Sequence, residues 1–228
     1  MTELFSDTTF LCLLLTLGCF TIGSACQKKW KLAVLNPIVI AAVLIIGVLS
    51  ALDVPFTVYQ PGCQALQFLL TPATICLAIS FYEQLQALKG KLPAVLAGVL
   101  AGTVCSLLTV AAMAKLFSLD AAVTISLLPK SVTTAIGLPL SQEAGGIGAL
   151  TTAVIILTGV LGSVIGPMLC KLFRLRDPVA QGAALGTSAH VIGTTRAAQM
   201  SELAGAVSSL SLTVAGIVTA VIFSVFLR

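Results

Sequence analysis

The chain has 228 residues, of which 58% are hydrophobic and only 9% are charged. Its mean hydropathy of +1.11 excludes a soluble domain, because a protein folded in water needs a polar surface. The net charge of +4 is scattered over short loops, which excludes the clustered basic surface of a nucleic-acid-binding protein. A spanning helix takes roughly 20 apolar residues, so the composition predicts an all-α polytopic membrane protein.

The first predicted span, residues 8–24, lacks the basic leader and cleavage site of a secretory signal, so we expect it to be retained. A cluster of three lysines around a tryptophan follows: Lys28, Lys29, Lys31 and Trp30. Such a cluster indicates the cytoplasmic side of the membrane. The N-terminus is therefore predicted to lie outside.

Two further spans are predicted before residue 90, at 36–52 and 65–81, with an outer loop at 53–63 between them. Asn36 precedes Pro37, which is typical of a helix start, and Asn36 is either a cap or a polar group facing a cavity. Glu83 follows the third of these spans. We treat Asn36 and Glu83 as second-tier candidates for a site.

Three continuous spans are predicted in the rest of the chain, at residues 93–117, 147–172 and 206–227. Two of them carry pairs of glycines at a spacing of four, which favours close helix packing: Gly98 with Gly102, and Gly162 with Gly166.

Between these spans lie two apolar stretches interrupted by polar residues, 126–142 and 184–199. The first contains Lys130 between prolines and hydroxyl residues, and the second contains the only histidine, His190, and Arg196. Hydrocarbon penalises such groups unless they face protein, water or a ligand. We therefore predict that both stretches are broken helices that form one binding site.

The two stretches repeat at an offset of 57 residues. Four identities carry the repeat: Asp120 with Asp177, Leu128 with Leu185, Ser131 with Ser188, and Gln142 with Gln199. Both aspartates occupy predicted helix N-caps. The breaks are predicted at Pro129-Lys130 and Gly186-Thr187, with new half-helices beginning near the two serines. One span separates the units, so they should form the inverted repeat of a secondary transporter.

Two topologies fit this pattern. If both stretches cross the membrane, the chain has eight crossings with two discontinuous helices, and a basic cluster falls outside: Lys171, Arg174 and Arg176. If both are re-entrant, six helices span and the cluster falls inside, as the positive-inside rule favours. We prefer the re-entrant arrangement, with scaffold spans at residues 1–63 and a core at 64–228, whose inverted halves are 64–143 and 147–228.

Two half-helix N-termini facing each other at mid-membrane attract an anion. Ten residues are candidate ligands: Lys130, Ser131, Thr133, Thr134, Thr187, Ser188, His190, Thr194, Thr195 and Arg196. Each has a structural alternative, since Lys130 can pair with Glu143, His190 can bond a neighbouring helix, and the hydroxyls can bond the preceding turn. His190 also suits a proton carrier.

Enzymatic chemistry is not indicated. The chain has no Gly-rich phosphate loop, no carboxylate pair in an apolar stretch and no nucleophile with a recognisable base. Most of the seven cysteines lie inside apolar runs, no CxxC pair occurs, and one histidine cannot complete a metal cluster. We expect no catalysis, no metal and no cofactor.

The blocks LLPKSVTTAIG and GTSAHVIGTTRAAQ, together with Asn36-Pro37 and TPATICLAISFYEQL, resemble the LrgB/CidB membrane protein family. The resemblance covers roughly residues 32–226. It implies a bacterial inner-membrane protein that acts with an LrgA/CidA-like partner. Bacterial members of the family behave like holins or antiholins and modulate murein hydrolases and lysis. Fused chloroplast relatives look like glycolate/glycerate carriers, and bacterial pairs are linked to pyruvate movement.

The inverted repeat favours the carrier. We expect a membrane transporter for a small monocarboxylate of the glycolate, glycerate, pyruvate or lactate type, with antiholin-like control of lysis as the alternative. By analogy with other carriers, a homodimer is expected.

Overall fold

The computed structural model describes residues 9–30, 37–69, 72 and 90–226. Most of the predicted span at 65–81, and both second-tier candidates, Asn36 and Glu83, lie outside the described residues. The elements in the described part are helical. The chain divides into two compact units, residues 1–78 and 79–228, and each unit is taken by itself below.

The first unit contains four described helices: α2 (Thr9–Trp30), α3 (Pro37–Ala51), α4 (Phe56–Gly62) and α5 (Gln64–Phe68). Gly23 lies against the backbone of Pro37, and Cys12 packs with Leu49, so α2 and α3 are antiparallel. The helix pair agrees with the first two predicted spans.

Two predictions about loops in this unit are wrong. Helix α2 continues through Lys28 and Lys29, because lysine is a good helix former and suits the negative end of a helix. The predicted outer loop at 53–63 contains α4. Its residue Tyr59 is buried and shares a hydrogen bond of 2.5 Å with Thr16 of α2, which ties the short helix to the longer one.

The second unit consists of three long helices and two interrupted segments. The long helices are α7 (Leu92–Leu116), α10 (Gly148–Leu172) and α12 (Glu202–Phe226). The first interrupted segment comprises α8 (Ala121–Leu127), η1 (Leu128–Ser131) and α9 (Thr134–Glu143). The second is α11 (Pro178–Met200). The three spans predicted in this region agree with α7, α10 and α12.

Four of the described helices are long and apolar enough to cross a membrane: Phe10–Lys29, Leu92–Leu116, Gly148–Leu172 and Glu202–Val225. Helix α3 is apolar but has only 15 residues. The all-helical, polytopic membrane architecture predicted from composition is confirmed.

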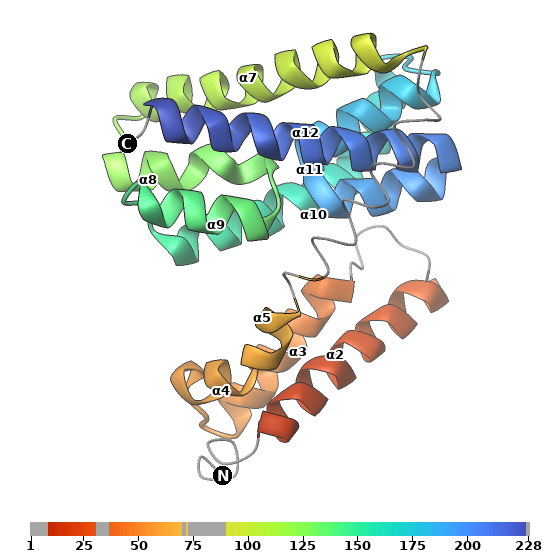
Figure 1. Cartoon of the computed structure of the whole chain (residues 1–228). Helices are drawn as coiled ribbons and strands as arrows, with labels where there is room; N and C mark the ends of the chain where they lie inside the picture. The colour runs from red at the N-terminus through yellow and green to blue at the C-terminus, as the bar shows by residue number, and fades with distance from the viewer. Residues whose placement is uncertain (1–8, 31–36, 70–71, 73–89, 227–228) are drawn as a thin grey trace. The chain divides into compact units, whose positions relative to one another are not determined.

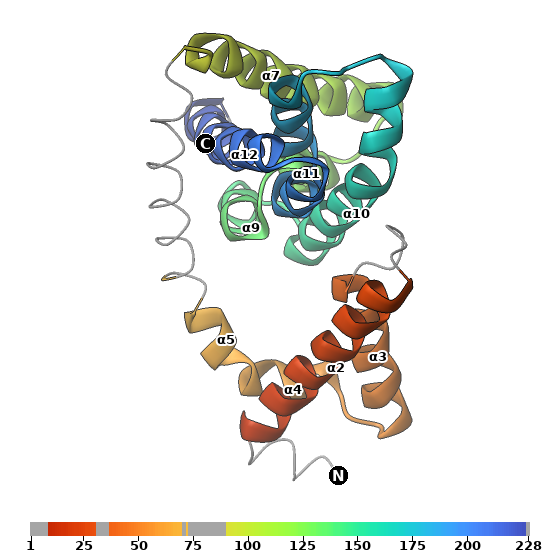
Figure 2. The same cartoon turned by 90° about the vertical axis from the view of Figure 1, so that its right-hand side faces the viewer.

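The long helices of the second unit alternate in direction. Val95 and Val99, near the start of α7, share a core cluster with Val207 and Leu210, near the start of α12, so α7 and α12 are parallel. Figures 1 and 2 show these two helices on one side of the unit, with α10 across from them. Helix α10 runs in the opposite direction.

The first interrupted segment enters and leaves on one side of the unit. Ser126 of α8 accepts a hydrogen bond of 2.7 Å from the Ile147 N–H, just before α10 begins. Ser141 of α9 shares a hydrogen bond of 2.7 Å with Thr151 in the first turn of α10. Both arms therefore lie beside the same end of α10, and we call residues 121–143 the first hairpin.

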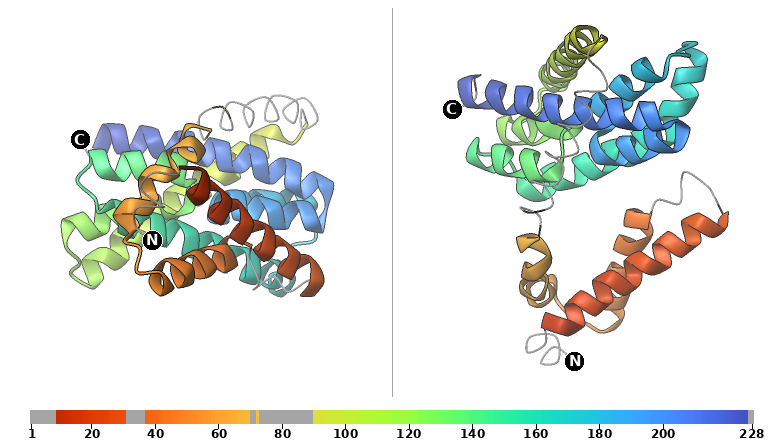
Figure 3. Two further views of the ribbon diagram at one scale, coloured as in Figure 1. Left: turned by 90° about the horizontal axis from the view of Figure 1, so that it is seen from below. Right: turned by 45° about the vertical axis from the view of Figure 1, so that its right-hand side comes forward.

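The second interrupted segment is also re-entrant. Gly182, in its first half, lies against the Ala204 carbonyl, and Ala198, in its second half, lies against Gly205. Both halves therefore meet α12 near its start, and we call residues 178–200 the second hairpin. Figure 3 shows the two hairpins entering the unit from opposite ends. The re-entrant arrangement is the correct one, and the eight-crossing alternative is wrong.

The repeat of 57 residues is present in the backbone. Three pairs of landmarks are separated by this offset: the starts of α8 and α11 (Ala121, Pro178), the breaks (Val132–Thr133, Ala189–His190), and the ends of the hairpins (Glu143, Met200). Helix α7 precedes the first hairpin, and α10 precedes the second. Because these two helices run in opposite directions, the two hairpins form an inverted pair within the second unit.

The predicted break at Pro129-Lys130 is present, whereas the break predicted at Gly186-Thr187 lies three residues later, at Ala189–His190. Pro129 has non-helical backbone angles (φ −83°, ψ 21°), so the first arm is kinked there, and the chain becomes extended at Val132 and Thr133 before α9 begins. Gly186, in contrast, does not stop the second arm. A Cβ at Gly186 would collide with the backbone of Ser208, so this glycine is needed for the approach of α12 and stays helical.

Candidate functional site

A cavity of about 790 Å³ lies between α7 and the first half of the second hairpin. Small side chains line most of its walls: Ala94, Gly98, Gly102, Ala180, Ala183 and Ala184. Gly98 faces this space, since a Cβ there would meet no atom within 4 Å. Small side chains on two facing helices thus leave an open cavity that larger side chains would fill.

The inner end of the cavity holds a lysine among hydroxyls. The Lys130 Nζ donates to Ser106 Oγ at 3.2 Å and to Ser131 Oγ at 3.1 Å, and the two serine hydroxyls lie 3.1 Å apart. Within the described residues, the structure records no ion pair between Lys130 and Glu143. A half-buried ammonium without a carboxylate partner is able to receive an anion from the cavity.

Ser106 of α7 was missed by the sequence reasoning. It continues the stripe of Gly98 and Gly102 by one further step of four residues. That spacing places all three on one helix face. The stripe was interpreted as a packing face, but its third member carries a hydroxyl next to Lys130, and this signal was present in the sequence.

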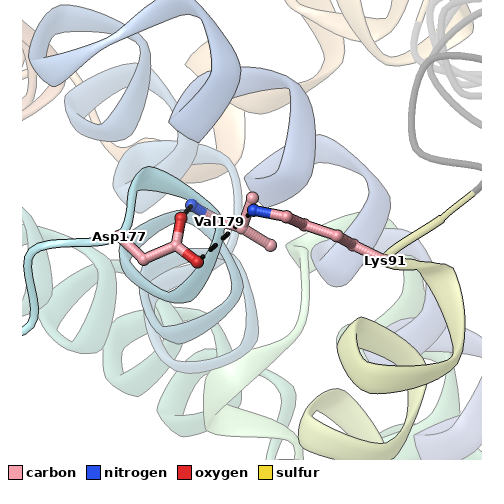
Figure 4. A network of polar contacts seen from close by, with 3 residues as sticks. All are labelled: Lys91, Asp177 and Val179. Carbon is pink, nitrogen blue, oxygen red and sulfur yellow. Dashed lines mark hydrogen bonds and ion pairs between the residues drawn. The ribbon is translucent and has the colours of Figure 1, made fainter.

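The mouth of the cavity is bridged by an ion pair. Lys91 Nζ lies 3.6 Å from Asp177 Oδ2, as Figure 4 shows, and the two side chains are 60% and 54% exposed. Asp177 Oδ1 also accepts a hydrogen bond of 3.0 Å from Val179 N–H, which caps α11 as predicted. Exposed pairs of this kind contribute little stability, so the pair is able to open.

Four of the ten predicted site residues line this cavity together: Lys130, Ser131, Thr187 and Ser188. Thr187 and Ser188 donate to the carbonyls of the preceding turn, each at 2.7 Å. Their oxygen lone pairs remain available to a ligand. Residues from both hairpins thus share one cavity, although the cavity is bounded by the first arm of each hairpin.

His190 lies at the tip of the second hairpin and does not line this cavity. It is 4% exposed, and its Nε2 is 2.9 Å from the Ile155 carbonyl oxygen of α10. Its φ of 41° lies in the left-handed region, which is costly for a residue with a Cβ and persists only where packing holds it. In the structure, His190 therefore bonds a neighbouring helix, which was the structural alternative to a role as a ligand.

The other predicted residues lie past the two breaks. Thr194 donates to the His190 carbonyl and shares a bond with Ser208, whereas Thr195 bonds Val191. Arg196 donates to Gln199 at 2.9 Å. These three residues do not line the cavity.

Thr133 and Thr134 mark the start of α9, and the second arm of the other hairpin begins at Val191. The second half-helices therefore begin three residues after Ser131 and Ser188, so these serines belong to the ends of the first arms. The cavity meets the C-terminal ends of the first arms, whose partial negative charge favours the Lys130 ammonium. Attraction of an anion must then come from Lys130 and not from helix dipoles.

Comparison with known proteins identifies the family of the chain. The LrgB-like family matches residues 16–228. The chain belongs to the LrgB-like family. Its relatives include the antiholin-like protein LrgB of Bacillus cereus (strain B4264) and that of Bacillus anthracis (strain CDC 684 / NRRL 3495), each 36% identical over 96% of both chains. No solved structure matches the chain. The family assignment made from the two hairpin blocks is confirmed.

Proposed function

We propose that this membrane protein carries a small monocarboxylate of the glycolate, glycerate, pyruvate or lactate type. The observation that carries the proposal is the Lys130 ammonium at the inner end of a cavity, bonded to two serine hydroxyls. A carboxylate that replaces one of these neutral acceptors gains a charge-assisted bond. The surrounding small apolar side chains suit a short acid with one charge better than a dicarboxylate, which would bury a second charge.

The inverted pair of hairpins supports a carrier mechanism. Secondary transporters with inverted repeats bind substrate where broken segments meet and open alternately to the two sides. In the proposed orientation, the basic cluster of Lys171, Arg174 and Arg176 faces the cytoplasm, and the mouth at Lys91 and Asp177 opens to that side. Localisation in the bacterial inner membrane, homodimerisation and an LrgA/CidA-like partner are part of the same proposal.

Uptake by proteoliposomes tests the carrier. The purified protein, alone and with an LrgA-like partner, is expected to take up labelled glycolate or pyruvate in a saturable way. Lys130→Gln removes one charged hydrogen bond, worth about 1.5–3 kcal/mol, so the apparent affinity should fall roughly 10- to 150-fold. The matched control is Lys115→Gln, an exposed lysine in the last turn of α7. Equal uptake by both variants would refute the role of Lys130.

A second candidate function has its own support. The relatives are named antiholin-like proteins, which favours control of murein hydrolase activity and lysis. Cells that express Lys130→Gln separate the two functions. If lysis control depends on carboxylate movement, the variant should lose both activities. If no acid is transported with or without the partner, yet expression alters autolysis, the antiholin-like function is the correct one.

Proton coupling through His190, hypothesised from the sequence, stays a prediction. Uptake that does not depend on pH and that is unchanged in His190→Gln would contradict it.

A further inference from the structure

A small void lies beneath the inner end of the cavity, where four elements of the second unit meet. Its volume is about 10 Å³, and five of its lining residues carry hydroxyls: Thr103, Ser106, Ser131, Thr187 and Thr219. Three of these residues, Ser106, Ser131 and Thr187, also line the large cavity. The void therefore adjoins the cavity, from which these three residues separate it, and lies in the core between α7, η1, α11 and α12.

Thr103 of α7 is the unusual member of this set. It is only 4% exposed, and its Oγ1 has no hydrogen-bond partner among the residues that the structure describes. Threonines in comparable positions bond the preceding turn, as Thr187 does to Ala183 and Thr219 to Ala215, each at 2.7 Å. A buried hydroxyl left unpaired costs about 1–3 kcal/mol, so a partner inside the void is expected.

The hydrogen-bond donors and acceptors that the lining hydroxyls leave free identify the chemistry of that partner. Thr103 offers a free O–H donor, whereas Thr187 and Thr219 have used their protons and offer lone pairs. An oxygen that accepts one bond and donates one or two matches this set. A cation is disfavoured, because the Lys130 ammonium is bonded to Ser131 on the same wall. A carboxylate is too large, since about 10–15 Å³ holds a single water.

We propose that the void is a subsite for one neutral hydroxyl oxygen, with Thr103 as its specificity-determining residue. The oxygen is supplied by an ordered water or by the hydroxyl of a 2-hydroxy acid whose carboxylate is at Lys130. Only the second source rests on the proposed function. In both cases the oxygen links α7, the two hairpins and α12, and it satisfies the buried threonine.

The test combines an experimental high-resolution structure with binding measurements on the full chain. Wild type is solved without ligand and with glycolate, and density in the void is read directly. Binding of glycolate and of acetate, which lacks the hydroxyl, is then compared for wild type, Thr103→Val and Thr103→Ser. The matched control is Thr152→Val, whose hydroxyl bonds Gly148 in α10 and lies outside both the cavity and the void.

Each outcome decides between the sources. A ligand hydroxyl in the void predicts that Thr103→Val weakens glycolate binding about fivefold to tenfold and leaves acetate binding unchanged. An ordered water predicts density in the ligand-free protein and an equal loss for both acids. Density for water in a protein that binds neither acid supports the subsite while it refutes the carrier. If Thr103→Val does not fold, the test rests on the density in the wild-type void and on Thr103→Ser. Thr103→Ser keeps the hydroxyl and should bind both acids like wild type. An empty void with and without glycolate, or a Thr103 hydroxyl bonded to its own helix, would overturn the proposal.

Discussion

The contact of the second hairpin with α12 makes a sharp prediction at Gly186. A Cβ built at this position would overlap the Ser208 carbonyl oxygen and lie 2.9 Å from the Ser208 carbonyl carbon and Cα. These are backbone atoms, so no side-chain rotation relieves the overlap. The cost of such overpacking is about 1–3 kcal/mol. Gly186→Ala should therefore destabilise the protein.

The matched control is Gly98→Ala. Gly98 is also helical, but a Cβ there meets nothing within 4 Å. In a helix, Gly→Ala alone stabilises by roughly 1 kcal/mol. Because this gain applies to both glycines, the two variants should differ by the overpacking cost of about 1–3 kcal/mol, which corresponds to a difference in Tm on the order of 2–12 °C for a chain of this size.

Thermal unfolding of the detergent-solubilised protein measures that difference. Gly98→Ala is expected to unfold at or slightly above the wild-type temperature, and Gly186→Ala below Gly98→Ala. If Gly186→Ala is as stable as Gly98→Ala, the second hairpin does not pack on α12 as described, and the re-entrant topology loses its support.

Three further changes test the mouth and the tip. Asp177→Asn keeps an acceptor for Val179 N–H, so Asp177→Ala should be less stable than Asp177→Asn by about 1 kcal/mol in thermal unfolding; equal stabilities would contradict the cap. Lys91→Gln breaks an exposed ion pair, so its cost should stay below about 1 kcal/mol and vanish at high salt; a large cost that resists salt would show that the pair is structural. His190→Ala leaves the Ile155 carbonyl without its bond and opens a buried space, so a loss of about 2–4 kcal/mol is expected in unfolding; wild-type stability would refute the anchoring role of His190.

Several features of the fold were predictable from local chemistry. Spans at 93–117 and 147–172 were placed within about a residue of α7 and α10, because a helix in lipid must satisfy every backbone group and stay apolar throughout. The offset of 57 was visible because both hairpins start after an aspartate, although only Asp177 caps its helix through the side chain. Asp120 and Asp177 both stand at the N-cap position.

The position of the second break was not predictable in this way. Pro129 and Gly186 are the strongest local signals for a break. The first arm is indeed kinked at Pro129, yet Gly186 is helical, and the second break falls three residues later at Ala189–His190. The end of a helix inside a protein depends on what packs against it. His190 adopts its unusual backbone conformation beside the Ile155 carbonyl, a contact across 35 residues of sequence that no local pattern encodes.

By itself, the sequence determined that this protein is a bundle of membrane helices with two related interruptions, because hydropathy, capping residues and repeat spacing are local properties. Only the tertiary structure decided which polar groups share a cavity. It brought Ser106 and Thr103 of α7 to Lys130 and Thr187, and it turned His190 toward α10. The rotation of each helix about its axis sets these neighbours, and that rotation is fixed by packing between segments far apart in the chain.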